Sequence, residues 1–129
     1  MAHYLTHEEV LVIHAKIVDE TGGAHGIRDI HRIASLVKRP KMQYGGADLY
    51  PTLSKKAAVY FHSTALDHPF IDGNKRTAIA LAVRFLHLND YEFSCSNAEM
   101  EKFVLDAVVK KYEIKAIAEW LKKHSKKTS

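Results

Sequence analysis

The sequence predicts an all-α protein, a compact single-domain bundle of about six helices. The chain has 129 residues, enough for one domain and not two, and its composition of 47% hydrophobic and 26% charged side chains is that of an ordinary globular domain. Glycine and proline are confined to three short stretches, 22–26, 40–51 and 69–73. The segments between these stretches carry apolar side chains at helical spacing, which favours helices over strands throughout residues 1–129.

Two helices are predicted before residue 40. Thr6 and Glu9 form a capping box, so the first helix is expected to begin after Thr6 and to stop at Gly22. Asp29 can cap a second, shorter helix. That helix is expected to end before Pro40, because the residue preceding a proline disfavours helical geometry.

The middle of the chain predicts a loop and two more helices. Residues 40–53 contain two prolines and a Gly-Gly pair, which indicates a long loop or a small hairpin. A third helix starts at Ser54. A fourth runs from the 67–73 loop to about Asn89 and is apolar on most of its circumference, which predicts that it lies at the centre of the bundle.

The C-terminal part predicts the last two helices and a basic tail. Residues 91–95 are extended at best, Ser96 and Glu99 form another capping box, and the last helix spans about 114–124. Residues 110–129 hold seven lysines and two glutamates, so the net charge of +4 belongs to this end of the chain. Such a run is typical of a solvated helix end, here a lysine-rich tail of about 122–129. Nucleic-acid binding by the isolated protein is therefore not expected.

Composition also excludes several classes of protein. The single cysteine, Cys95, rules out an internal disulfide, lacks the setting of a nucleophile and is expected to be inert. No Cys/His set has the spacing of a zinc motif. The N-terminus lacks the features of a signal peptide, and no apolar stretch approaches the ~20 residues of a membrane span. We expect a cytoplasmic protein without a membrane partner.

The segment with chemical potential is residues 68–77, His-Pro-Phe-Ile-Asp-Gly-Asn-Lys-Arg-Thr, at the start of the fourth helix. A helix N-terminus presents unpaired N–H groups and a positive dipole end. Gly73 allows the backbone to approach a ligand closely. Lys75 and Arg76 are unfavourable in a first helical turn unless an anion joins them, so the pattern predicts a site for a polyphosphate.

Two further side chains complete a reactive set. Asp72 offers the type of carboxylate that Mg²⁺ takes together with phosphate oxygens, and His68 can accept a proton near neutral pH. A base, a metal ligand and a phosphate cradle suffice to transfer a phosphoryl-type group from a nucleotide to a hydroxyl. Taken singly, Asp72 or Asn74 could be an N-cap, Gly73 a turn residue and His68 structural. The paired cations are the feature that these simpler interpretations explain least well.

These residues resemble the signature of the Fic/Doc family, in its death-on-curing (Doc) branch. The resemblance includes the Gly-Gly-x-x-Gly-Ile-Arg-Asp run at 22–29 and extends over residues 4–124. It implies an all-helical fold that binds ATP and Mg²⁺ at the motif. The roles it implies are a catalytic base at His68, a metal ligand at Asp72, a phosphate site at Gly73, Asn74, Lys75 and Arg76, and a core anchor at Phe70.

The 40–53 loop resembles the flap that positions a target segment in this family. Its candidate docking residues are Tyr44, Gly45, Gly46 and Tyr50. The alternative is a plain surface connection.

The reaction depends on two departures from the wider family. Lys75 stands where most AMP-transferring members carry glycine, and Ile79 where they carry a second arginine. In Doc-like members this change accompanies transfer of the γ-phosphate, and the resemblance implies elongation factor Tu as the target, with arrest of translation. AMP transfer to protein hydroxyls remains an alternative, as does a non-catalytic nucleotide-binding or DNA-contacting regulator. The inhibitory Ser/Thr-x-x-x-Glu pattern of some relatives is absent from the sequence, so the resemblance implies an antitoxin that inhibits in trans.

Overall fold

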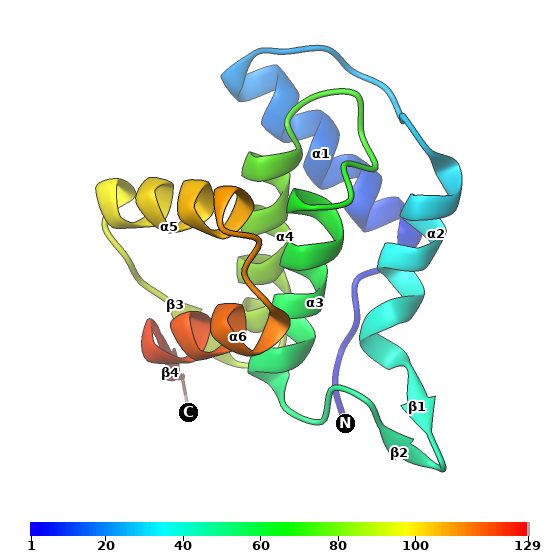
Figure 1. The fold of residues 1–129 in the computed structure, drawn as a ribbon, viewed down its shortest axis with the longest axis vertical. Coiled ribbons are helices and arrows are strands. Elements are labelled where there is room, and N and C mark those ends of the chain that lie inside the picture. The colour runs from blue at the N-terminus through cyan, green and yellow to red at the C-terminus, as the bar shows by residue number, and fades with distance from the viewer. Residues whose placement is uncertain (129) are drawn as a thin grey trace.

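Two helices joined by a short loop form the centre of the fold, α3 (Leu53–Ala65) and α4 (Asn74–Leu88) (Figure 1). The computed structural model describes residues 1–128. The prediction that α4 is central is confirmed, but α3 is central as well, because every side chain from Lys56 to Phe61 is buried. The centre of the bundle is therefore a helical pair, with its connecting loop at one end of the molecule (Figure 1).

The two N-terminal helices begin and end at the predicted signals. Helix α1 (His7–Thr21) starts with the capping box, in which Thr6 and Glu9 exchange two hydrogen bonds of 3.1 Å, and it ends at Gly22. Helix α2 (Ile30–Lys38) is capped by the Asp29 carboxylate, which accepts from two backbone N–H groups of its first turn. A 3₁₀ turn, η1 (Arg39–Lys41), follows α2.

The predicted loop or hairpin is a hairpin. Strands β1 (Gln43–Tyr44) and β2 (Ala47–Asp48) pair antiparallel around Gly45 and Gly46, whose φ angles are +59° and +82°. Two successive positive φ angles are the requirement of the tight hairpin turn that Gly-Gly satisfies.

A buried lysine attaches this hairpin to the body of the protein. The Lys56 ammonium donates to a carboxylate oxygen of Asp48 at 3.1 Å, to Tyr50 O at 2.6 Å and to Pro40 O at 3.4 Å. The Lys56 side chain is only 4% exposed, so its charge is compensated by these three acceptors instead of by water.

The C-terminal part differs from the predicted tail. Helix α5 (Asn97–Val109) begins directly after its predicted cap, Ser96, and α6 (Ile114–Lys123) ends one residue before its predicted end. Ser125–Lys127 form a strand, β4, which pairs antiparallel with β3 (Tyr91–Phe93). The predicted lysine-rich tail is therefore paired at residues 125–127, although Lys126 and Lys127 stay exposed, and Ser129 lies outside the described residues. The pairing places Glu92 opposite Lys126, so opposite charges face each other across the two strands.

One hydrophobic core joins the six helices. It extends from Leu5, before α1, to Leu121 in α6, and α5 joins it through Val104 and Ala107. The ring of Phe103, also in α5, stacks on that of Trp120 with centroids 3.9 Å apart. Among residues 1–128, no helix combines the length and apolar character that crossing a bilayer requires.

Replacing the buried lysine should weaken the fold. Lys56→Met leaves the acceptors on Asp48, Tyr50 and Pro40 without their donor, so we expect the free energy of unfolding to fall by about 2 kcal/mol in urea titrations. Lys55→Met, at the exposed neighbouring position, is the matched control and should change it by less than about 0.5 kcal/mol. Equal stabilities for the two variants would show that the Lys56 contacts do not hold the hairpin.

Candidate active site

The loop that carries the chemical motif joins the end of α3 to the start of α4, at the end of this helical pair opposite the β1–β2 hairpin. We call residues 66–73 the motif loop and residues 22–29 the bracing segment, because the latter runs beside the motif loop between α1 and α2 (Figure 1). The two segments are more than 35 residues apart in sequence, and their contact determines the geometry of the site.

Backbone hydrogen bonds join the two segments. The N–H groups of Arg28 and Asp29 both donate to the carbonyl oxygen of Pro69, at 2.9 and 3.1 Å. In return, the Ile71 N–H donates to Gly26 O at 3.1 Å. The motif loop therefore behaves as one side of a short antiparallel pair, a more rigid arrangement than a free surface loop provides.

The glycines of the bracing segment allow this close approach. A Cβ atom on Gly23 would lie 2.7 Å from a carboxylate oxygen of Asp72, and one on Gly26 would lie 2.7 Å from the side chain of Ile71. Both glycines also have φ angles that other residues rarely adopt, +113° and +127°. A Cβ at Gly23 or Gly26 would therefore displace the Asp72 or Ile71 side chain from its place in the motif loop.

A buried aromatic pair supports the motif loop from below. Phe70 is 1% exposed, and its ring stacks on that of His14 in α1, with centroids 3.7 Å apart and planes 4° from parallel. His14 Nε2 lies 2.8 Å from the Asp72 carbonyl oxygen. Because a carbonyl only accepts, Nε2 carries the proton and donates it. His14 is a buried histidine with its hydrogen bond satisfied, and its contact with the motif loop could not be read from the sequence.

The side chain of Asn74 closes the loop. Its carbonyl oxygen accepts from the Phe70 N–H at 3.0 Å, and its NH₂ group donates to Phe70 O at 2.9 Å. These two bonds tie the amide to the backbone of residue 70. Asn74 therefore shapes the motif loop through its side chain, and its backbone N–H remains available to a ligand.

The Asp72 carboxylate is exposed and ionised. One oxygen accepts from the Ala24 N–H at 3.2 Å and the other from the Gly73 N–H at 2.8 Å. These hydrogen bonds, with a smaller contribution from the charge of Arg76, hold the pKa of Asp72 below its usual range. The side chain bonds to residues before the helix and not to the first turn of α4, so it is not the simple N-cap that the sequence left open.

Helix α4 begins without a side-chain cap. Its N-cap residue, Gly73, has a φ of +74° and supplies no side-chain acceptor, and the first turn contains no acidic residue. Lys75 and Arg76 are both exposed in this turn. The helices capped by side chains are α1, α2, α3 and α5, through Thr6, Asp29, Thr52 and Ser96. The start of α4 thus presents free N–H groups and two cations to solvent.

A groove extends from this helix end between α1, α4 and α5. It has a volume of about 670 Å³, and Lys75 and Arg76 stand at its border. One NH group of Arg76 donates to the Thr21 hydroxyl at 3.1 Å, which directs the guanidinium toward the end of α1. The apolar part of the lining includes Ile17, Ile79, Val83, Met100 and Leu105.

His68 occupies a strained position in the motif loop. Its side chain is half-buried, and its φ angle is +50°, a left-handed value that costs a residue with a Cβ about 1 kcal/mol or more. The hydrogen bonds that follow it directly, at Pro69 and Ile71, hold the backbone in this conformation. Such strain is characteristic of functional loops.

Comparison with known proteins identifies the family. The sequence matches the model of the Fic/DOC family over residues 4–86. The chain belongs to this family. It is 39% identical over 94 residues to "Toxin Doc" of Mycolicibacterium smegmatis, which covers 73% of this chain and 70% of that protein. It is 26% identical over 120 residues to "Protein kinase doc" of Escherichia phage P1, which covers 93% of this chain and 94% of that protein. These relatives place it in the Doc branch.

The structure places the 40–53 loop, the candidate docking flap, away from the motif loop. The hairpin with Tyr44, Gly45, Gly46 and Tyr50 lies at the opposite end of α3 from the motif loop (Figure 1). A helix of 13 residues, about 20 Å long, separates them. The segment that borders the motif loop is residues 22–29, and its three glycines were the signal for that position.

The bracing contact can be tested with two neighbouring glycines. Gly22 and Gly23 both have positive φ angles, but a Cβ on Gly22 meets nothing within 4 Å, whereas one on Gly23 meets Asp72. We expect Gly22→Ala to cost about 1 kcal/mol of unfolding free energy and Gly23→Ala about 1–2 kcal/mol more. Hydrogen exchange at the Ala24 N–H should accelerate only in Gly23→Ala. Equal behaviour of the two variants would contradict the steric requirement.

Acid should destabilise the fold through two histidines. Burial lowers the pKa of His14, and burial together with the charge of Arg39 lowers that of His62. The pKa of histidine in an unfolded chain is about 6.5, and well above this pH both histidines are neutral in the folded and the unfolded protein. Below it, the unfolded chain binds protons that the folded chain excludes, so the free energy of unfolding falls. Each group contributes a slope of up to about 1.4 kcal/mol per pH unit. His14→Gln and His62→Gln should each flatten urea-derived stability between pH 7 and 5, and unchanged slopes would contradict this origin.

Proposed function

We propose that this protein is the toxin of a toxin–antitoxin pair and transfers the γ-phosphate of ATP to a hydroxyl of a target protein. Its membership of the Fic/DOC family and its similarity to proteins named "Toxin Doc" and "Protein kinase doc" support this class of activity. The observation that carries the proposal is the uncapped start of α4, where Lys75 and Arg76 are exposed without an acidic residue in the same turn. A polyphosphate is the ligand that such a helix end favours.

The residues present fit ATP and Mg²⁺. The backbone N–H groups of Asn74, Lys75 and Arg76 belong to the unpaired donors of the first turn, and the two cationic side chains can bind phosphate oxygens. Gly73, the N-cap residue, places no β-carbon beside these donors. The ionised carboxylate of Asp72 retains lone pairs for a hard cation such as Mg²⁺. When bound, ATP with its magnesium ion supplies the phosphoryl group and the positive charge that its transfer requires.

His68 is the proposed general base. In the proposed reaction its imidazole takes the proton of the target hydroxyl as the oxygen attacks the γ-phosphorus atom, while the bond from that phosphorus to the β–γ bridging oxygen breaks and ADP leaves. Its strained backbone, held by the neighbouring hydrogen bonds, fixes where the ring can lie. We propose elongation factor Tu as the target and arrest of translation as the result, which would place the action of this protein in the cytoplasm.

Two side chains favour phosphate transfer over AMP transfer. Lys75 places a long cationic side chain at the position where, by the family resemblance, most AMP-transferring members carry glycine. Ile79, where a second arginine would stand, is 8% exposed and lines the apolar groove. The charge available for the phosphates is therefore concentrated at the very start of α4, which favours a different placement of the triphosphate. AMP transfer from the same loop is the competing reaction.

The surroundings of the motif loop suggest where two partners bind. Residues 22–28 of the bracing segment are exposed, and the segment bonds to Pro69, the neighbour of His68 in the chain. We therefore propose that the target hydroxyl approaches along it and not along the 43–48 hairpin. The groove between α1, α4 and α5 is mostly apolar and ends at Lys75 and Arg76. A helix of the antitoxin seated in it would cover both cations and block nucleotide binding, which would inhibit in trans.

Isotopic labelling tests the reaction directly. Purified protein is incubated with its target, elongation factor Tu, or with cell extract, and with ATP labelled at either the α or the γ phosphorus. We expect label on protein from the γ position only. His68→Ala should reduce this transfer by about 10²–10⁴-fold while nucleotide binding persists. His87→Ala, at an exposed position on α4, is the control and should retain full transfer.

The outcomes separate the alternatives. Label from the α position alone would establish AMP transfer and overturn the kinase proposal. Nucleotide binding without transfer of either label would favour a non-catalytic regulator.

A further inference from the structure

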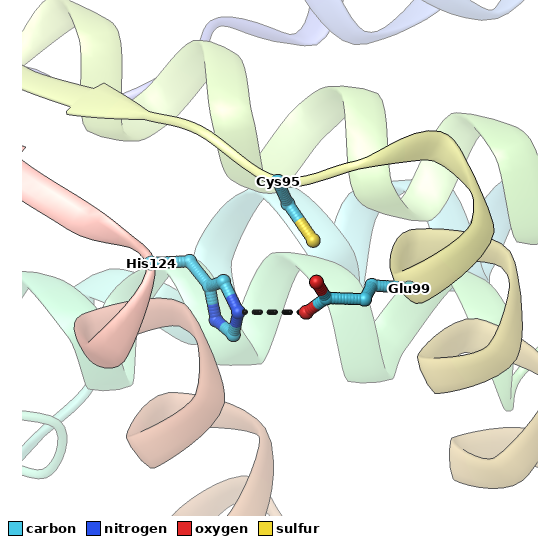
Figure 2. Close-up of side chains that lie close together, drawn as sticks. All are labelled: Cys95, Glu99 and His124. Atoms are coloured by element: carbon cyan, nitrogen blue, oxygen red, sulfur yellow. Dashed lines mark ion pairs between the residues drawn. The ribbon is translucent and has the colours of Figure 1, made fainter.

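A second cluster of reactive side chains lies away from the motif loop, where the C-terminal strand pairs with β3. It consists of Cys95 in the connection before α5, Glu99 in the first turn of α5 and His124 at the end of α6 (Figure 2). One ligand atom from each residue lies within 4.8 Å of the other two. The Ser94 N–H donates to His124 O at 2.9 Å, so the two connections are also joined through the backbone.

The orientation of His124 is fixed by its second nitrogen. Nδ1 lies 2.9 Å from the carbonyl oxygen of Trp120, which can only accept, so Nδ1 is protonated and donates. The neutral ring then has its lone pair on Nε2, the atom that faces Glu99 (Figure 2). A ring N–H bonded to a backbone carbonyl is the usual support of a histidine that ligates a metal through its other nitrogen.

The distance between His124 and Glu99 suits two ligands of one ion. Nε2 is 3.4 Å from the nearer carboxylate oxygen. A charge-assisted hydrogen bond would measure about 2.7–2.9 Å, so this contact is long for a direct bond. Two ligands at about 2.0–2.1 Å from a tetrahedral ion are about 3.3 Å apart, which matches the observed separation.

Cys95 determines which metal the cluster would take. Its sulfur atom points toward the other two side chains (Figure 2). Sulfur, imidazole nitrogen and a carboxylate form a ligand set for Zn²⁺, whereas Mg²⁺ and Ca²⁺ take oxygen ligands. Glu99 is exposed, so a water molecule can complete the tetrahedron. We propose that Cys95, Glu99 and His124 form a Zn²⁺ site, with the sulfur moving inward by about 1 Å on binding.

Such a site would fix one wall of the groove. Zn²⁺ would connect the start of α5 to the end of α6 and to the β3–β4 pair, and the same α5 carries Met100 and Leu105 into the groove lining. The sequence offered no sign of this cluster, because Cys95 and His124 are 29 positions apart and meet only through strand pairing. This proposal does not depend on the proposed function, since none of the three residues belongs to the motif loop.

Binding has a defined proton balance. A neutral Cys95 thiol must lose its proton to the solvent when the Zn–S bond forms, while a neutral His124 and an ionised Glu99 lose none. Each ion bound therefore releases about one proton, or two if His124 was protonated beforehand.

The test uses tag-free, full-length protein treated with a chelator and then titrated with Zn²⁺ or, as a spectroscopic probe, Co²⁺. Trp120 is the only tryptophan in the sequence, and its ring centroid lies 4.6 Å from that of His124, so its fluorescence should report binding. We expect saturation at one ion per chain, release of at least one proton per ion, a thiolate-to-cobalt charge-transfer band and a higher thermal midpoint with Zn²⁺.

Variants locate the site. Cys95→Ser and His124→Gln should each weaken binding at least tenfold and, for the cysteine variant, remove the charge-transfer band. His87→Gln, at an exposed histidine on α4, should bind as the unmodified protein does. Binding without proton release or a thiolate band in the unmodified protein would overturn the proposal, as would unchanged affinity in Cys95→Ser.

Discussion

The site depends on one contact, the pairing of the bracing segment with the motif loop above the buried rings of His14 and Phe70. The stacked rings anchor the motif loop to the core, and backbone hydrogen bonds to Pro69 hold it beside the bracing segment. Gly23 permits the close approach that these bonds require. Because α1, α2 and the motif loop all meet at this contact, a disturbance there should reach the start of α4 without touching the residues proposed to bind the ligand.

The electrostatics at the start of α4 follow from this arrangement. The Asn74 amide is occupied by the backbone of Phe70, and the Asp72 carboxylate bonds to the bracing segment and to Gly73. The two side chains that could have capped the helix are thus directed elsewhere, and Lys75 and Arg76 remain in an uncapped first turn. An arrangement that is unfavourable for an isolated helix becomes favourable when an anion with several phosphate groups joins it.

The sequence predicts what depends on local signals and misses what depends on distant pairing. The caps at Thr6 and Asp29 and the ends of most helices could be predicted, because capping is decided within a few residues. The strand at 125–127 could not, because its lysines show no apolar alternation and its partner lies more than 30 residues away. The role of Gly23 was hidden for the same reason. The hairpin at 43–48 was predicted from its Gly-Gly turn, but its distance from the motif loop depends on the length and packing of α3.

The nucleotide site can be measured by calorimetric titration of the purified, partner-free protein with ATP in the presence of Mg²⁺. We expect one binding site per chain, with an affinity that falls as salt is added and that drops about tenfold or more in Lys75→Met. Lys115→Met, at an exposed lysine on α6, should bind ATP as the unmodified protein does. Absence of binding, or equal affinity in the two variants, would contradict the claim that the adjacent cations at the start of α4 form a nucleotide site.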